Sequence, residues 1–77
     1  MKILKVYQQK LRFKNYSKNT IEIYSCYLEK FLISENIKDP YQVTTKQITN
    51  YLENKTYSSI SMQNQYIGSL KLFAKYI

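Results

Sequence analysis

The residue types that usually carry catalysis are scarce in this chain. It has no histidine, the commonest general base, and one cysteine, Cys26. Its five acidic residues are spread along the sequence: Glu22, Glu29, Glu35, Asp39 and Glu53. None of them is paired as acid–base work requires, and solvated helix faces explain them better. Since a glycine-rich phosphate loop and a Ser/His/Asp set are also missing, we expect no catalytic centre here.

Metal and redox chemistry find equally little support. One cysteine cannot form an internal disulfide, and the usual His and Cys ligands for zinc are missing. We predict that Cys26 is a small, buried or half-buried apolar residue rather than a reactive thiol. The nine tyrosines lack a neighbouring base or cation cluster that would activate one of them, and they suit core or rim positions. We therefore expect no metal and no cofactor.

The positive charge is concentrated at one end. The net charge is +7, and six basic residues without any acid occupy the first eighteen positions: Lys2, Lys5, Lys10, Arg12, Lys14 and Lys18. A basic segment on a small domain suggests a polyanionic partner, most often nucleic acid, although a solubilising surface explains the charge equally well. No signal peptide or membrane-spanning run is evident, so we expect a soluble intracellular protein.

Apolar residues at helical spacing predict four helices, and no alternating run supports a strand. The first helix, residues 2–13, has an inward face of Ile3, Leu4, Tyr7 and Leu11. The second, about residues 18–34, begins at the N-cap Ser17 and has the apolar stripe Ile21, Tyr24, Leu28, Phe31 and Leu32. A loop with Pro40 follows over residues 36–41.

The third helix, residues 44–54, starts with the capping box Thr44-Thr45-Lys46-Gln47, and its inward residues are Ile48, Tyr51 and Leu52. The fourth begins at residues 59–61, and its expected apolar stripe is Ile67, Leu70, Phe73, Ala74 and Ile77. This helix has no C-cap glycine, so we expect a longer protein to continue beyond it. The fold prediction is one compact, all-α, four-helix domain over residues 1–77.

Two polar helix faces favour DNA as the partner. The second helix opens with phosphate-binding residue types at its N-terminus and carries Asn19, Glu22, Ile23, Cys26 and Lys30 opposite its core stripe. On the fourth helix, Ser61, Met62, Gln65 and Ser69 share a face, and amide side chains there could read adenine edges in a major groove. The alternative is a protein-interaction module whose basic first helix docks on an acidic partner.

Three ordered motifs resemble the core-binding domain of tyrosine recombinases (phage integrases). They are Ser17-Lys18-Asn19-Thr20-Ile21-Glu22-Ile23-Tyr24 with Leu28 and Phe31-Leu32, then the segment 43–52, and then the segment 64–77. They resemble that family's S-x-x-T-x-x-x-Y opening, its I-T-x-x-x-I-x-x-Y-L helix and its N-x-x-L-S-x-L ending. One departure is Met62-Gln63, where the family commonly has Thr-Ile.

The resemblance implies a SAM-like orthogonal bundle that forms half of a clamp around a recombination core site. Its second and fourth helices would lie against the major groove of double-stranded DNA. The candidate DNA-contacting residues are Ser17, Lys18, Asn19, Thr20, Lys30, Ser61, Asn64, Gln65, Tyr66, Ser69 and Lys71.

The family's catalytic residues lie in a separate C-terminal domain and comprise a tyrosine, two arginines, a lysine and usually a histidine. With one arginine and no histidine, this chain cannot supply that set, so we expect it not to be an enzyme by itself. The expected partners are DNA, that C-terminal domain and other recombinase protomers on the DNA, without a membrane. The expected location is the bacterial cytoplasm, at the nucleoid when the protein is on DNA.

Overall fold

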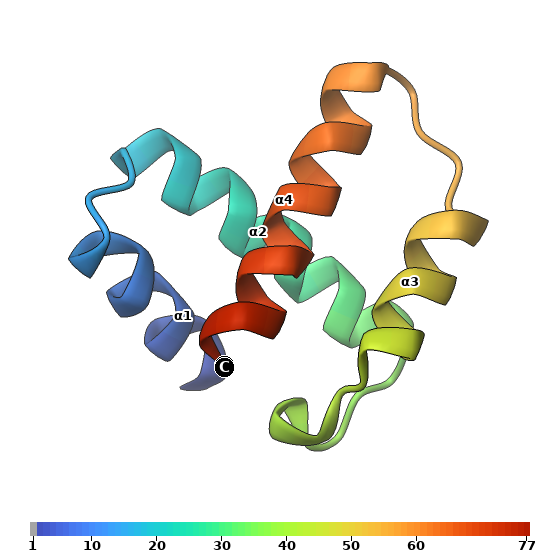
Figure 1. Ribbon diagram of the computed structural model, residues 1–77, viewed down its shortest axis with the longest axis horizontal. Helices are drawn as coiled ribbons and strands as arrows, with labels where there is room; N and C mark the ends of the chain where they lie inside the picture. Colours follow the sequence, from blue (N-terminus) through green and yellow to red (C-terminus); the bar gives the residue numbers. More distant parts are fainter. Residues whose placement is uncertain (1) are drawn as a thin grey trace.

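The computed structural model describes residues 2–77, and within that range every regular element is helical. The elements are α1 (Lys2–Phe13), α2 (Lys18–Ser34), the short 3-10 helix η1 (Pro40–Gln42), α3 (Thr45–Asn54) and α4 (Ile60–Tyr76). Helices α2 and α4 cross at the centre of the molecule, and α1 and α3 flank this crossing on opposite sides (Figure 1). The predicted all-α architecture of four helices is confirmed.

Local hydrogen bonds fix the start of each of the last three α-helices. Ser17 accepts a hydrogen bond from the Thr20 backbone N–H at the start of α2, and Ser59 does the same for the Met62 N–H at the start of α4. At the start of α3, the Gln47 N–H donates to the Thr44 hydroxyl and the Thr44 N–H donates to the Gln47 side chain. The N-cap at Ser17 and the capping box at Thr44 are therefore both confirmed.

Two asparagines end α1 and α2 by turning the chain through a left-handed conformation. Asn15 has φ 65° and Asn36 has φ 51°, a backbone region that asparagine tolerates better than most residues. In each case the residue after the asparagine donates its N–H back into the helix, from Tyr16 to the Leu11 carbonyl at 3.1 Å and from Ile37 to the Leu32 carbonyl at 2.9 Å. The helices can therefore turn sharply without glycine.

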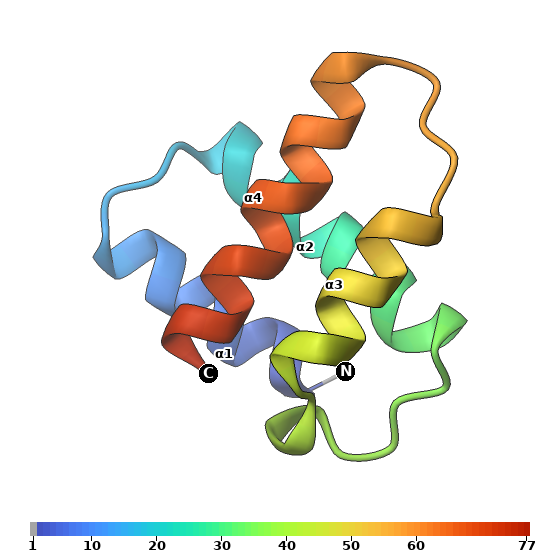
Figure 2. The ribbon, with the colours of Figure 1, turned by 45° about the vertical axis from the view of Figure 1, so that its right-hand side comes forward.

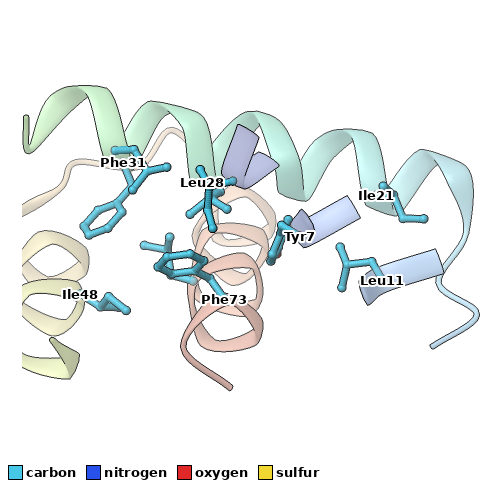
Figure 3. Close-up of a cluster of buried hydrophobic side chains, with 10 residues drawn as sticks. Tyr7, Leu11, Ile21, Leu28, Phe31, Ile48 and Phe73 are labelled. Atoms are coloured by element: carbon cyan, nitrogen blue, oxygen red, sulfur yellow. The ribbon is translucent and has the colours of Figure 1, made fainter. Parts of the chain in front are cut away.

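The core lies where α1, α2 and α4 meet and extends to α3 through Ile48. Its buried apolar residues are Ile3, Tyr7, Leu11, Ile21, Leu28, Phe31, Leu32, Ile48, Leu70 and Phe73 (Figure 3). The inward faces predicted for α1 and α2 supply most of this set. The apolar stripes of the two helices therefore pack as their spacing indicates.

A buried polar chain ties α1, α2 and α4 together at the crossing. The Ser69 hydroxyl of α4 donates to the Tyr24 carbonyl of α2 at 2.7 Å, and the Tyr7 hydroxyl of α1 donates to the Ser69 carbonyl at 2.9 Å. Gly68 lies beside Ser69, and a Cβ atom there would come within 2.8 Å of the Tyr24 hydroxyl. Small residues at 68 and 69 thus let the two central helices approach closely.

The inward face of α4 differs from the predicted stripe. Tyr66, Ser69, Leu70 and Phe73 are buried, whereas Ala74 is exposed and Ile67 is only half-buried. The helix is turned because Ser69 bonds to α2 and because the Tyr66 ring stacks on Tyr27 of α2, with 4.0 Å between ring centroids. Ser69 and Tyr66 are therefore buried in the core, where the apolar pattern predicted Ile67 and Ala74.

Candidate nucleic-acid interface

The outer side of α2 presents a stripe of mostly polar residues with one isoleucine, which we call the α2 stripe: Asn19, Ile23, Cys26 and Lys30. Their spacing places them along one side of the helix, and all but the half-buried Ile23 are exposed. The prediction that Cys26 is buried or half-buried is therefore wrong, because this thiol lies on the side of α2 opposite the core. The sequence also placed Glu22 on this side, and it is exposed at the edge of the stripe, where it lines the cavity between α1 and α2.

The start of α2 leaves one hydroxyl proton free. The Ser17 hydroxyl accepts from the Thr20 N–H at 3.1 Å and donates to the Thr20 hydroxyl oxygen at 2.9 Å. Ser17 is thereby committed to capping the helix, whereas Thr20 keeps its own O–H as a donor. Of these two candidates, Thr20 is the better placed to donate to a phosphate oxygen.

Lys18 lies apart from the α4 side of α2. Together with Arg12 of α1 and Asn15 of the connecting turn, it lines a cavity of about 520 Å³ between α1 and α2. Glu22 and Gln8 also line this cavity. The structure therefore groups Lys18 with the end of α1, while the α2 stripe follows the outer side of the same helix.

The first half of α4 extends past its crossing with α2 (Figure 1 and Figure 2), and Gln65 in this half contacts α2. Ser61 and Asn64 are exposed and Gln65 is half-buried, with Ser61 one turn before Gln65 on the same side of the helix. The Tyr27 hydroxyl of α2 donates to the Gln65 side-chain oxygen at 3.3 Å, and the Lys30 ammonium lies 5.8 Å from the Tyr27 ring centroid. Tyr27 thus joins the two helices, and we call the α2 stripe together with Thr20, Tyr27, Ser61 and Gln65 the α2–α4 face. Asn64, seven positions before Lys71, lies on the Lys71 side of α4 instead.

Tyr66 and Ser69 do not belong to this face, and their prediction as surface contacts is wrong. Tyr66 is 1% exposed and Ser69 is 0% exposed, so neither side chain can meet a partner. Tyr66 is the centre of an aromatic cluster formed with Tyr27, Tyr51 and Tyr57. Both residues act on the face indirectly, because they hold α4 against α2.

Lys71 lies on a different side of α4 from Gln65. It lines a groove of about 430 Å³ between α3 and α4, together with Thr49, Glu53 and Gln63. Gln65, in contrast, contacts α2. Lys71, a candidate DNA contact from the sequence, therefore faces this groove and not the side of α4 that carries Gln65.

Three tyrosines have raised pKa values, which makes each of them a weaker nucleophile at neutral pH. Burial raises the pKa of Tyr7 and of Tyr51 to about 12, and it also raises the pKa of Tyr57, with the nearby Tyr66 adding to the effect. A nucleophilic tyrosine would need the opposite shift or an adjacent base. These three residues are neutral packing and hydrogen-bonding groups at physiological pH.

Within residues 2–77, no cluster of three His, Cys, Asp or Glu side chains is arranged to hold a metal ion. No helix in the described part is long and apolar enough to cross a membrane.

Sequence reasoning missed Tyr27 as a functional residue. It lies three positions before Lys30, so the contact between the Tyr27 ring and that ammonium follows from helical spacing. Its hydrogen bond with Gln65 joins residues 38 positions apart, and no local sequence pattern predicts such a contact. The residue that organises the candidate face was therefore recognisable only in three dimensions.

The fold and the α2–α4 face together define a small helical domain with a polar, basic-flanked surface. Residues 3–77 match the family model of the phage integrase N-terminal SAM-like domain, and the chain belongs to this family. The resemblance drawn from the three motifs and the expectation of a SAM-like bundle are confirmed. No curated protein and no solved structure matches the chain.

Proposed function

We propose that this chain binds duplex DNA as the core-binding domain of a site-specific tyrosine recombinase, where it forms half of a clamp around the recombination core site. The observation that carries the proposal is the convergence of Lys30, Tyr27 and Gln65 on the α2–α4 face, in a chain of the integrase family. A cation for phosphate and an amide for base edges are the two kinds of contact that duplex recognition needs.

The charge distribution supports the same proposal. The named residues of the α2–α4 face carry no negative charge, although the exposed Glu22 lies at its edge. The six basic residues of positions 2–18 are all exposed on α1, the turn after it and the start of α2. Such an arrangement attracts a polyanion over several ångströms and leaves the uncharged groups of the face to contact the bases. An acidic protein partner would use the same lysines but would have no need of the amide and hydroxyl groups on α4.

The proposal assigns no chemical step to this domain. Strand cleavage would belong to a separate C-terminal domain of the parent protein, and this domain would contribute to site choice and to assembly with other protomers on DNA. It would act in the bacterial cytoplasm, at the nucleoid.

The direct test is binding of a fluorescent duplex of about 30 base pairs, followed by anisotropy at increasing salt. We expect binding at low salt, with log affinity falling against log salt by about 0.9 for each neutralised phosphate. Poly-glutamate is the competitor for the alternative function. If poly-glutamate binds and duplex DNA does not, the chain is a module for acidic proteins.

The exposed thiol of Cys26 provides a second test without altering the face. It lies in the α2 stripe, so bound DNA should slow its alkylation by a maleimide. A matched control moves the thiol to the exposed position 46 of α3 in a Cys26→Ser, Lys46→Cys protein. Equal protection at both positions would contradict the placement of DNA on the α2–α4 face.

A further inference from the structure

Contacts with two neighbouring side chains hold the half-buried ring of Tyr27 in place. Its ring stacks on the buried Tyr66 ring with 4.0 Å between centroids and 20° between planes. Lys30 sits one turn further along α2 with its ammonium 5.8 Å from the Tyr27 centroid. The phenol oxygen is therefore fixed in space, and it is this oxygen that donates a hydrogen bond to Gln65.

The contact engages one particular end of the Gln65 amide. The Tyr27 hydroxyl donates to Oε1 at 3.3 Å, a long hydrogen bond that orients the amide more than it stabilises the fold. The Nε2 end, which carries two N–H donors, is thereby turned away from Tyr27. Gln65 then offers a partner mainly donors.

In the major groove, an amide held in this orientation should prefer a different base from a freely rotating amide. Adenine offers the acceptor N7 beside the N6 amino donor, so it needs both ends of a glutamine amide. Guanine offers only acceptors, N7 and O6, which suit N–H donors. An adenine contact would have to use the remaining lone pair of Oε1, because the Tyr27 hydroxyl already occupies the other.

We propose that Tyr27 is a positioning residue that turns the Gln65 amide donors toward DNA, so that Gln65 selects guanine over adenine at one position of the site. This replaces the adenine reading expected from the sequence. It rests on the proposed function, because it needs duplex DNA on the α2–α4 face.

The experiment is selection of duplexes from a randomised library by the 77-residue chain at low salt, compared among variants. Wild type should enrich guanine at one position, and Gln65→Ala should lose that enrichment. Tyr27→Phe keeps the ring for stacking but lacks the hydroxyl. It should reduce guanine-over-adenine selection about three- to tenfold, the factor that one hydrogen bond of ordinary net strength controls.

Tyr57→Phe is the matched control for loss of a hydroxyl in the same cluster. The Tyr57 ring also packs on Tyr66, but its hydroxyl donates to the Leu52 carbonyl and does not touch Gln65. Its base preference should equal that of wild type. In a Gln65→Ala background, Tyr27→Phe should cause no further change, because the group that it orients is gone.

The side-chain amide of Gln65 reports the same contact without DNA. In a ¹H–¹⁵N spectrum, Tyr27→Phe should shift the Gln65 NH₂ signals while Tyr57→Phe leaves them in place. If Tyr27→Phe keeps the base preference of wild type, or if the selected base is adenine, this proposal is overturned and the proposed function stands. Failure of wild type to bind any duplex overturns both.

Discussion

Because the hydroxyl of Tyr7 is buried, the variant Tyr7→Phe should be less stable than wild type at neutral pH and more stable than wild type at high pH. Tyr7 is 0% exposed and donates to the Ser69 carbonyl at 2.9 Å. Tyr7→Phe keeps the ring and removes one buried hydrogen bond. The Ser69 carbonyl is within α4 and can keep its helical partner, so the free energy of unfolding should fall by about 1 kcal/mol at pH 8.

The pH dependence follows from the pKa of the same group. Burial raises the pKa of Tyr7 from 10.0 to about 12, so the folded state holds the phenol proton more tightly than the unfolded chain does. This contribution is fully present below pH 10 and is lost as the pH rises through 12. Two pKa units correspond to about 2.7 kcal/mol, and about half of that is lost by about pH 11.

Tyr7→Phe lacks this titration, so the two curves of unfolding free energy against pH should cross at about pH 11. Urea unfolding followed by far-ultraviolet circular dichroism at intervals from pH 8 to 12 measures both curves. Tyr51, whose pKa is also raised to about 12 by burial, is present in both proteins and cancels in the comparison. Parallel curves that never approach one another would refute the reasoning, because burial of Tyr7 would then not control the alkaline loss.

Three further substitutions test the face and the helix ends. Lys30→Ala should weaken binding to all duplexes about two- to fivefold at low salt and lower the salt slope by about 0.9. The control Lys46→Ala, on α3, should weaken binding less. Equal effects of the two variants in anisotropy would contradict the placement of DNA on the α2–α4 face. Asn36→Ala should lower the free energy of unfolding by about 1 kcal/mol and Asn36→Gly far less, because the backbone there has φ 51°. Equal losses in urea unfolding would show that the left-handed backbone at position 36 does not limit stability. Thr44→Ala should lower stability by about 1 kcal/mol through loss of the capping box, with Thr45→Ala, one residue along, as the milder control.

The features predicted well from sequence are those that depend on neighbours along the chain. The N-caps at Ser17 and Thr44 need partners only three residues away. The apolar stripes of α1 and α2 also repeat over short intervals, so their inward faces were predicted correctly. The motifs that identified the family have the same local character, since each lies mostly within one helix.

The errors fall where a side chain finds a partner far along the chain. Ser69 is buried because Tyr24, 45 positions earlier, offers it a carbonyl, and a serine in a helix carries no sign of such a partner. Tyr66 suits either core or surface, and its stacking on Tyr27 decided the matter. The error at Lys71 is of another kind, because a spacing of six positions places Lys71 and Gln65 on different sides of α4 however the helix is rotated.

The close passage of Tyr24 over Gly68 has a consequence for how relatives of this chain can diverge. A side chain at 68 would occupy space that the Tyr24 hydroxyl now fills, since the two would approach within 2.8 Å. Among homologues, the two positions should therefore covary, with alanine or serine at 68 accompanied by a shorter residue at 24. Such a paired exchange would alter the crossing angle of α2 and α4, and with it the distance between the two rows of side chains presented to a partner. Divergence at this half-buried contact would thus change partner recognition while every exposed residue stays the same.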